Sequence, residues 1–301
     1  MKIIEIIRQR LSGKPPEHRK RVALVLSGGG ARGYFHIGAI EVLQERGYVI
    51  TSIAGTSIGA LVGGIFANGK LNELKQRILN LNRKQIIGLM DIKPGLDHLA
   101  TGNRLVEFLH DFTSDVRIEN LPLPFCCCAS DLISGREKVF TTGSLLTAIR
   151  ASISIPCFFS PIHEGDSTYV DGSVHNILPL DRVQRTEGDL LVAVNLNGSD
   201  NEPHTAYAKP NKTDNGFLAG LRKAIPLPKW QFSENYMNMA MRVTNLMLQT
   251  NTRLALGITP PDICVELPMN RFGLFDFDKG ADLIRFGREE MARQLDRFES
   301  E

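Results

Sequence analysis

Two glycine-rich turns early in the chain constrain its fold more than any other feature. The first turn, Ser27–Gly33, follows the β-type apolar run Val22–Leu26, and the second, Gly55–Gly59, follows a similar run at Val49–Ala54. Residues at helical spacing come after each turn, over Tyr34–Arg46 and Ile58–Asn68. Two strand–turn–helix units in succession predict a parallel sheet covered by helices, with both turns at the carboxyl edge of that sheet.

The rest of the chain continues this alternation. Further strands are predicted at Phe125–Ser130, Lys138–Thr142, Thr168–Asp171, Leu190–Asn195 and Ile263–Leu267, and further helices at Leu71–Asn82, Asn103–Asp111, Leu145–Ser152, Tyr236–Leu256 and Gly280–Arg297. The fold class is therefore α/β, with three layers (α/β/α) around a central, mostly parallel sheet. We expect a basic helical extension over residues 1–20, one domain over residues 21–301, and a long surface excursion at Gly198–Lys229.

Composition excludes several classes of protein. With 43% hydrophobic and 23% charged residues the chain has enough apolar material for a sizeable core. The net charge of +2 is too small to indicate a nucleic-acid partner. No run of about 18 apolar residues predicts a membrane-spanning helix, and charges interrupt the N-terminal apolar stretch, so a cytoplasmic location is expected. The consecutive Cys126, Cys127 and Cys128 fit a buried strand better than a disulfide or metal site.

The first glycine turn allows three interpretations. It can be a plain tight turn, a dinucleotide-binding loop, since Gly28, Gly30 and Gly33 satisfy G-x-G-x-x-G, or an oxyanion hole made of unpaired backbone amides. Dinucleotide binding requires an acidic residue at the end of the next strand, and here that strand runs into Gly55 without one.

The second turn, Gly55-Thr56-Ser57-Ile58-Gly59, matches the G-x-S-x-G pattern of a nucleophile elbow between a strand and a helix. The alternative is that Ser57 merely caps the helix. None of the seven histidines has a distinctive setting as a base. Asp171 is the better candidate, because it ends a strand and Gly172 follows at once, although Asp-Gly is also a common β-turn pair.

These three motifs, in this order, resemble those of patatin-like phospholipases, and in particular compact bacterial members similar to the catalytic domain of neuropathy target esterase. The resemblance implies the patatin-like fold, a serine nucleophile at Ser57 and a base at Asp171. It also implies an acyl-enzyme and no metal or cofactor. The remaining implied site residues are the oxyanion-hole residues Gly28, Gly29, Gly30 and Arg32 and the motif glycines Gly33, Gly55, Gly59 and Gly172. An exposed aspartate is a weak base, so we expect Asp171 to be buried and in contact with Ser57.

The implied activity is lipid acyl hydrolysis of the phospholipase A or lysophospholipase type. The alternatives are a short-chain carboxylesterase with the same dyad and a non-catalytic nucleotide-binding module that uses only the glycine loop. We expect an apolar trench for the acyl chain, formed by a flexible rim. A Met-rich helix could also contribute to the trench, although core packing is the favoured role of that helix. The trench residues are Ile86, Ile87, Leu89, Met90 and Leu96, and the helix residues are Met237, Met239, Met241, Met247 and Leu248.

Residues near the N-terminus suggest a peripheral contact. Ile3, Ile4, Ile7 and Leu11 share one helical face, with basic residues elsewhere. This helix is predicted to dock on its own domain or a partner subunit, and the alternative is binding to anionic lipid at the inner face of the membrane. The expected partner is a lipid or ester substrate; the sequence does not predict an oligomeric state.

Overall fold

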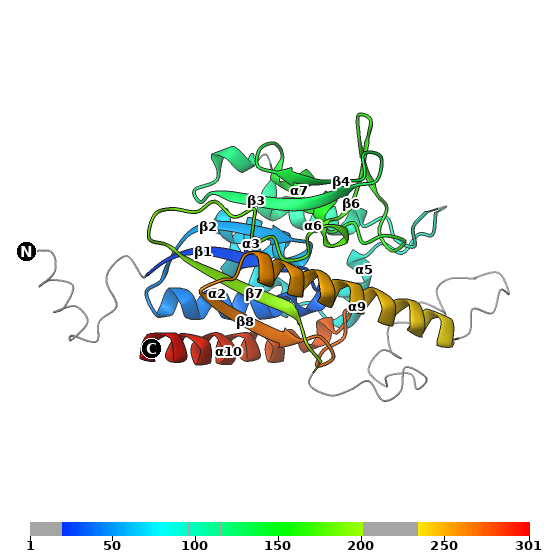
Figure 1. Cartoon of the computed structure of the whole chain (residues 1–301). Coiled ribbons are helices and arrows are strands. Elements are labelled where there is room, and N and C mark those ends of the chain that lie inside the picture. The colour runs from blue at the N-terminus through cyan, green and yellow to red at the C-terminus, as the bar shows by residue number, and fades with distance from the viewer. Residues whose placement is uncertain (1–19, 96, 115, 201–233) are drawn as a thin grey trace, which may run out of the picture.

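The computed structural model describes residues 20–95, 97–114, 116–200 and 234–301 (Figure 1). The predicted N-terminal helix and most of the predicted surface excursion lie outside the described residues. The strands are β1 (Arg21–Leu26), β2 (Val49–Thr56), β3 (Phe125–Asp131), β4 (Arg136–Phe140), β5 (Ile162–Glu164), β6 (Ser167–Asp171), β7 (Leu190–Gly198) and β8 (Ile263–Pro268).

The helices alternate with these strands along the chain. They are α2 (Tyr34–Glu45), α3 (Ile58–Ala67), α4 (Leu71–Leu79), α5 (Arg83–Leu89), α6 (Asn103–Thr113), α7 (Leu145–Ser152), α9 (Glu234–Ile258) and α10 (Gly280–Ser300). Short 3-10 turns are η2 (Gly30–Gly33), η3 (Ile118–Asn120), η4 (Gly172–Val174) and η5 (Phe277–Lys279).

Within the described residues the strands form one eight-stranded sheet in the order β5-β6-β3-β2-β1-β7-β8, and β4 pairs with β3. Strands β3, β2, β1, β7 and β8 are parallel neighbours, whereas β4 and β6 each run antiparallel to β3. The predicted mostly parallel sheet is therefore confirmed. The antiparallel pairing of β6 with β3 brings the end of β6 close to the carboxyl ends of the central strands.

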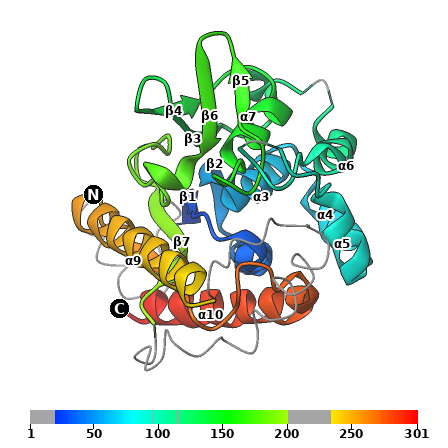
Figure 2. The ribbon, with the colours of Figure 1, turned by 90° about the vertical axis from the view of Figure 1, so that its right-hand side faces the viewer.

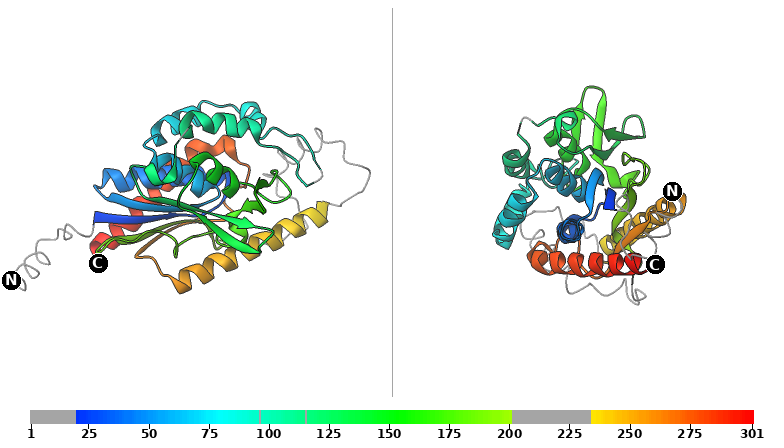
Figure 3. Two further views of the ribbon diagram at one scale, coloured as in Figure 1. Left: turned by 90° about the horizontal axis from the view of Figure 1, so that it is seen from above. Right: turned by 90° about the vertical axis from the view of Figure 1, so that its left-hand side faces the viewer.

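Helices cover both faces of the sheet, as predicted. Strand β1 alternates Val22, Leu24 and Leu26 toward the larger core, where they pack with α2, α3, α7 and α10. Its Ala23 and Val25 point to the other face, against the segment 177–183 and helix α9. Figures 2 and 3 show α9 on one side of the strands and α3 on the other. This double burial explains the continuous apolar runs in the sequence.

Most predicted elements are confirmed within a few residues. The three neighbouring cysteines lie in β3 and are buried, as expected. The segment expected to form a flexible rim contains helix α5, and Asn82, the residue before that helix, forms a capping box with Gln85.

Candidate active site

Ser57 occupies a sharp turn between β2 and α3. Its backbone has φ 54° and ψ −123°, a conformation that costs a non-glycine residue about 1–3 kcal/mol. A Cβ at Gly59 would clash with the carbonyl oxygen of Leu26, so only glycine lets α3 start this close to β1. The Ser57 side chain makes no helix-capping hydrogen bond, which contradicts the alternative that it serves only as a cap. The hydroxyl is therefore available for another partner.

That partner is Asp171, at the end of β6. The Ser57 Oγ donates a hydrogen bond of 2.5 Å to Asp171 Oδ2, and the two residues are 5% and 3% exposed. Burial raises the pKa of the Asp171 carboxyl above its usual value, and hydrogen bonds from Ser57 and Ser173 act in the opposite direction. The predicted burial of Asp171 and its contact with Ser57 are confirmed as geometry. Their catalytic roles stay a prediction.

Two serines at the end of α7 fix this pair in place, and the sequence analysis did not identify them. Ser152 Oγ accepts from the Ser57 amide at 2.8 Å and donates to the Cys128 carbonyl of β3 at 2.6 Å. The carbonyl of Ser154 accepts from the Asp171 amide at 2.8 Å. The alternation of serine and isoleucine over Ser152–Ile155, at and after the end of α7, was the available signal. It could not be interpreted without knowing that α7 ends beside both strands.

The first glycine turn lies against the nucleophile. A Cβ at Gly28 would lie 2.6 Å from Ser173 Oγ and 3.3 Å from Ser57 Cβ. The Gly28 amide donates to the Ile177 carbonyl at 3.0 Å, and the Arg32 amide donates to the Gly29 carbonyl at 3.3 Å. The amides of Gly29 and Gly30 have no hydrogen-bond acceptor among the described residues. Of the residues predicted for an oxyanion hole, these two therefore keep free donors.

Buried polar side chains hold this loop from behind. Asn197 Nδ2 donates to the Gly28 carbonyl at 2.9 Å, and Arg32 Nε donates to the Gly29 carbonyl at 3.0 Å. Because the C=O and N–H of a trans peptide point in opposite directions, these bonds turn the amides of Gly29 and Gly30 away from Asn197 and Arg32. Burial lowers the pKa of the Arg32 guanidinium to about 10. Arg32 thus acts on the loop through its side chain.

The other motif glycines lie where elements approach closely. A Cβ at Gly33 would clash with the Ile58 side chain, one at Gly55 with the Gly59 carbonyl, and one at Gly172 with the Cys128 carbonyl. Gly33 and Gly172 lie in the short turns η2 and η4, and Gly55 lies in β2 two residues before Ser57. The predicted motif residues are therefore brought together at one edge of the sheet.

An apolar cavity of about 150 Å³ begins at Ser57. Gly30 and Ser57 line it, together with Leu74 and Ile78 of α4 and Leu109 of α6. Of the predicted trench residues, Ile86, Leu89 and Met90 line the cavity, Ile87 packs beside it, and Leu96 lies outside the described residues. The walls are almost entirely hydrocarbon, so the cavity fits a chain of methylene groups.

The Met-rich helix α9 behaves differently from both expectations. Met239 and Met247 are exposed, so they neither fill the core nor line the cavity. Leu248 packs against the smaller core, and the side chains of Met237 and Met241 are not described. Core packing was wrong for Met239 and Met247 because a helical period gives one apolar face without saying whether that face meets the protein.

The described histidines take no part in the Ser57–Asp171 pair. His36 Nε2 contacts the Ser27 carbonyl at 2.9 Å, and His175 Nε2 contacts the Gly135 carbonyl at 3.2 Å. Across residues 20–200 and 234–301, apart from positions 96 and 115, no three His, Cys, Asp or Glu side chains are grouped as metal ligands. Over the same ranges, none of the helices has the length and hydropathy that crossing a bilayer requires.

Comparison with known proteins gives one family match. The profile described as patatin-like phospholipase matches residues 24–183. An uncharacterized NTE family protein of Mycobacterium tuberculosis is 42% identical over 194 residues, which are 64% of this chain and 53% of that protein. Lysophospholipase NTE1 of Kluyveromyces lactis is 27% identical over 274 residues, 88% of this chain and 18% of that protein. The chain thus spans about half the length of the mycobacterial relative and far less of the fungal one.

Two more distant similarities extend the comparison. Neuropathy target esterase sws of Drosophila melanogaster is 28% identical over 192 residues, 62% of this chain and 14% of that protein. Among solved structures, VipD from Legionella pneumophila aligns with a TM-score of 0.46 and 14% identity, over 94% of this chain and 67% of that one.

Proposed function

Because the chain belongs to the patatin-like phospholipase family, we propose that it is a serine-dependent lipid acyl hydrolase of the phospholipase A or lysophospholipase type. The observation that carries the proposal is the 2.5 Å hydrogen bond between the Ser57 hydroxyl and the buried Asp171 carboxylate beside an apolar cavity. The relatives named lysophospholipase and neuropathy target esterase support a lipid ester as substrate.

In the proposed first step, Ser57 Oγ attacks the ester carbonyl carbon while Asp171 takes the hydroxyl proton. The negative charge that develops on the carbonyl oxygen is stabilised by the free amides of Gly29 and Gly30. One such donor is typically worth about 3 kcal/mol in the transition state. The tetrahedral intermediate then collapses, the bond to the leaving alcohol breaks, and Asp171 returns the proton to that alcohol. The product of this step is an acyl-enzyme.

In the second step a water molecule attacks the acyl carbon and gives its proton to Asp171. Collapse of the second intermediate breaks the bond to Ser57 Oγ, which takes the proton back, and the carboxylic acid leaves. Burial makes this sequence feasible without histidine, because an aspartate with a raised pKa accepts a proton more readily near neutral pH. Ser152 and Ser154 would keep the pair aligned through both steps.

The cavity favours a long acyl chain over a short one. It runs from Ser57 between α3, α4 and α6, and every buried methylene contributes about 0.8 kcal/mol of transfer free energy. A chain-length series of p-nitrophenyl esters tests this point. We expect kcat/KM to rise from acetyl to medium or long acyl groups. A preference for acetyl would instead support a short-chain carboxylesterase.

Labelling by a fluorophosphonate probe tests the nucleophile directly. We expect the full chain to be labelled, Ser57→Ala to lose all labelling, and Ser134→Ala, a serine in an exposed turn, to keep it. Absence of labelling in the wild-type chain would contradict the hydrolase proposal and favour a module that only binds a ligand. The cytoplasmic location and the lipid role of residues 1–20 stay predictions.

A further inference from the structure

Helix α9 carries large apolar side chains that are exposed to solvent. They lie on one face of the helix between Met239 and Ile258 and are between 44% and 80% exposed. This apolar stripe consists of Met239, Val243, Leu246, Met247, Leu254 and Ile258. The opposite side of α9 packs on the sheet through Leu248, Ala255 and Leu256. The stripe extends for about 28 Å along the helix, which is unusual for a surface that meets only water.

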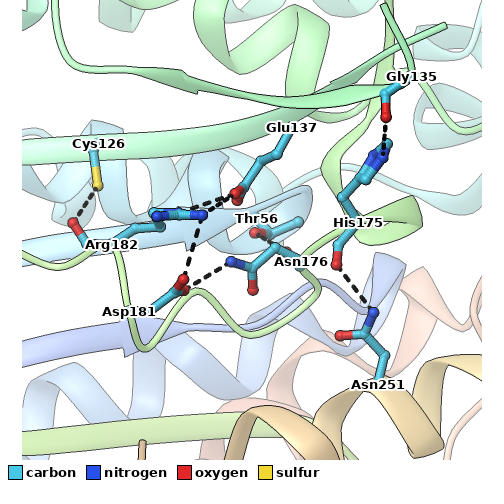
Figure 4. A network of polar contacts seen from close by, with 9 residues as sticks. All are labelled: Thr56, Cys126, Gly135, Glu137, His175, Asn176, Asp181, Arg182 and Asn251. Atoms are coloured by element: carbon cyan, nitrogen blue, oxygen red, sulfur yellow. Dashed lines mark hydrogen bonds and ion pairs between the residues drawn. The ribbon is translucent and has the colours of Figure 1, made fainter. Parts of the chain in front are cut away.

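Two short segments beside α9 continue the exposed apolar surface. Leu132 and Ile133, in the turn between β3 and β4, and Val174, at the end of η4, are each more than half exposed. His175 connects the three segments. Its ring contacts the Gly135 carbonyl at 3.2 Å, and its own carbonyl accepts from Asn251 of α9 at 3.0 Å (Figure 4). We call the stripe together with Leu132, Ile133 and Val174 the apolar rim.

The apolar rim lies next to the proposed catalytic pair. Val174 is three residues after Asp171, and the short turn η4 begins immediately after that aspartate. The β3–β4 turn follows the strand whose Ala129 pairs with Asp171. A surface that docks through the rim would therefore approach the same edge of the sheet that carries Ser57.

The charges along the apolar stripe of α9 are basic. From Met239 to Ile258 the sequence contains no Asp or Glu, and its charged residues are Arg242 and Arg253. Arg242 pairs with Asp200, whereas Arg253 makes a hydrogen bond only to Thr250 among the described residues. Arg136, beside the β3–β4 turn, is exposed and has no ion-pair partner among the described side chains. Asp131, at the end of β3, accepts hydrogen bonds from Ser134 and Ser167.

We propose that the apolar rim docks on an anionic lipid bilayer. Apolar side chains enter the boundary between headgroups and acyl chains, while Arg136 and Arg253 contact the anionic headgroups. In a symmetric dimer the same patch would meet itself and would bring like charges together, so a second copy is the weaker candidate. This inference rests on the proposed function, because a lipid acyl hydrolase would find its substrate in the bilayer. The docking itself requires no catalysis.

The experiment measures partition of the full chain onto large unilamellar vesicles by sedimentation. Binding is compared between vesicles of pure phosphatidylcholine and vesicles that also contain about 30% phosphatidylglycerol. This fraction of anionic lipid gives the vesicle surface a negative charge. The test variant is Met247→Gln/Leu254→Gln, and a second variant is Ile133→Gln. The matched control is Val49→Gln, which removes an exposed apolar side chain at the start of β2, outside the rim.

We expect the wild-type chain and V49Q to bind the anionic vesicles, M247Q/L254Q to lose about tenfold or more in partition coefficient, and I133Q to lose less. Hydrolysis of soluble p-nitrophenyl butyrate should be equal in all four proteins, which shows that each is folded and separates this inference from the proposed function. Equal partition of M247Q/L254Q and V49Q would overturn the proposal. So would a concentration-dependent dimer that M247Q/L254Q abolishes, because the rim would then be a protein interface.

Discussion

Asp171 combines a cost in stability with a proposed gain in activity. Its carboxyl is buried, and burial raises its pKa in the folded state above the value of about 3.9 expected in an unfolded chain. Between these two pKa values the folded protein holds a proton that the unfolded chain releases. The free energy of unfolding therefore falls as the pH rises through this window. At neutral pH the ionised carboxylate destabilises the folded protein.

Asp171→Asn is predicted to separate these two effects. The amide keeps the shape of the side chain, can accept from the Ser173 amide and can contact Ser57, but it cannot take a proton. We expect kcat/KM for an ester substrate to fall about 10³-fold or more. The melting temperature at neutral pH should equal or exceed that of the wild-type chain, with the difference shrinking below about pH 4. Thermal unfolding across a pH series checks this, and retained activity would refute the proposed base.

Asn197 is a positioning residue for the glycine loop. It donates to the Gly28 carbonyl from β7 and thereby orients the next amide. Asn197→Ala is predicted to lower kcat about ten- to a hundredfold with little change in KM, because a misaligned oxyanion donor affects the transition state more than substrate binding. Asn68→Ala is the control, since its amide also donates to a carbonyl, that of Phe112, away from the site. A loss confined to KM would contradict the role.

At the scale of elements, helices α3, α4, α5 and α6 make the proposed acyl site. Each contributes apolar side chains to the cavity wall, and α3 begins at the nucleophile itself. In the proposed acyl site, side chains on α4 and α6 would therefore help to set the length of chain that fits.

Ile78→Phe on α4 is predicted to shorten the accepted chain. The larger ring would displace about two methylenes of substrate, so kcat/KM for the longest p-nitrophenyl esters should fall about tenfold while short esters are hydrolysed as before. Leu79→Phe is the matched control, because the neighbouring Leu79 is exposed and does not line the cavity. A uniform loss across all chain lengths would indicate a folding defect instead.

At the scale of the whole molecule, the last helix of the described residues packs against the first of them, α2. Helix α10 packs along α2, and two glycines allow the close crossing: a Cβ at Gly38 would clash with the Ile284 carbonyl, and one at Gly287 with the Phe35 carbonyl. The C-terminal helix thus supports the helix that follows the glycine loop.

Gly38→Ala and Gly287→Ala are each predicted to lower the free energy of unfolding by about 1–3 kcal/mol, because the added methyl forces two packed helices apart. Gly257→Ala is the control. It lies in α9 with no atom within 4 Å of an added Cβ, so alanine there should stabilise the protein by about 0.5–1 kcal/mol. Urea denaturation measures all three. Equal changes in the free energy of unfolding at the three positions would show that helix propensity, and not the close crossing of α2 and α10, determines the effect of each substitution.

Local chemistry determined much of this protein. The two glycine turns, the strand runs before them and the elbow at Ser57 could be predicted because each depends on neighbouring residues and backbone conformation alone. The parallel direction of the central strands followed from the alternation of strand and helix. Burial of Asp171 could be predicted for two reasons only. The residue ends an apolar strand, and the implied role as a base requires a carboxyl that is not exposed.

Tertiary structure decided what distant segments do to one another. Ser57 and Asp171 are 114 positions apart, and Asn197 reaches Gly28 across 169 positions, so no local pattern contains either contact. Periodicity predicted helix α9 and its apolar residues. It could not indicate which face would meet the sheet, because a helical period fixes the relative directions of side chains, whereas packing against the rest of the chain fixes which of them are buried.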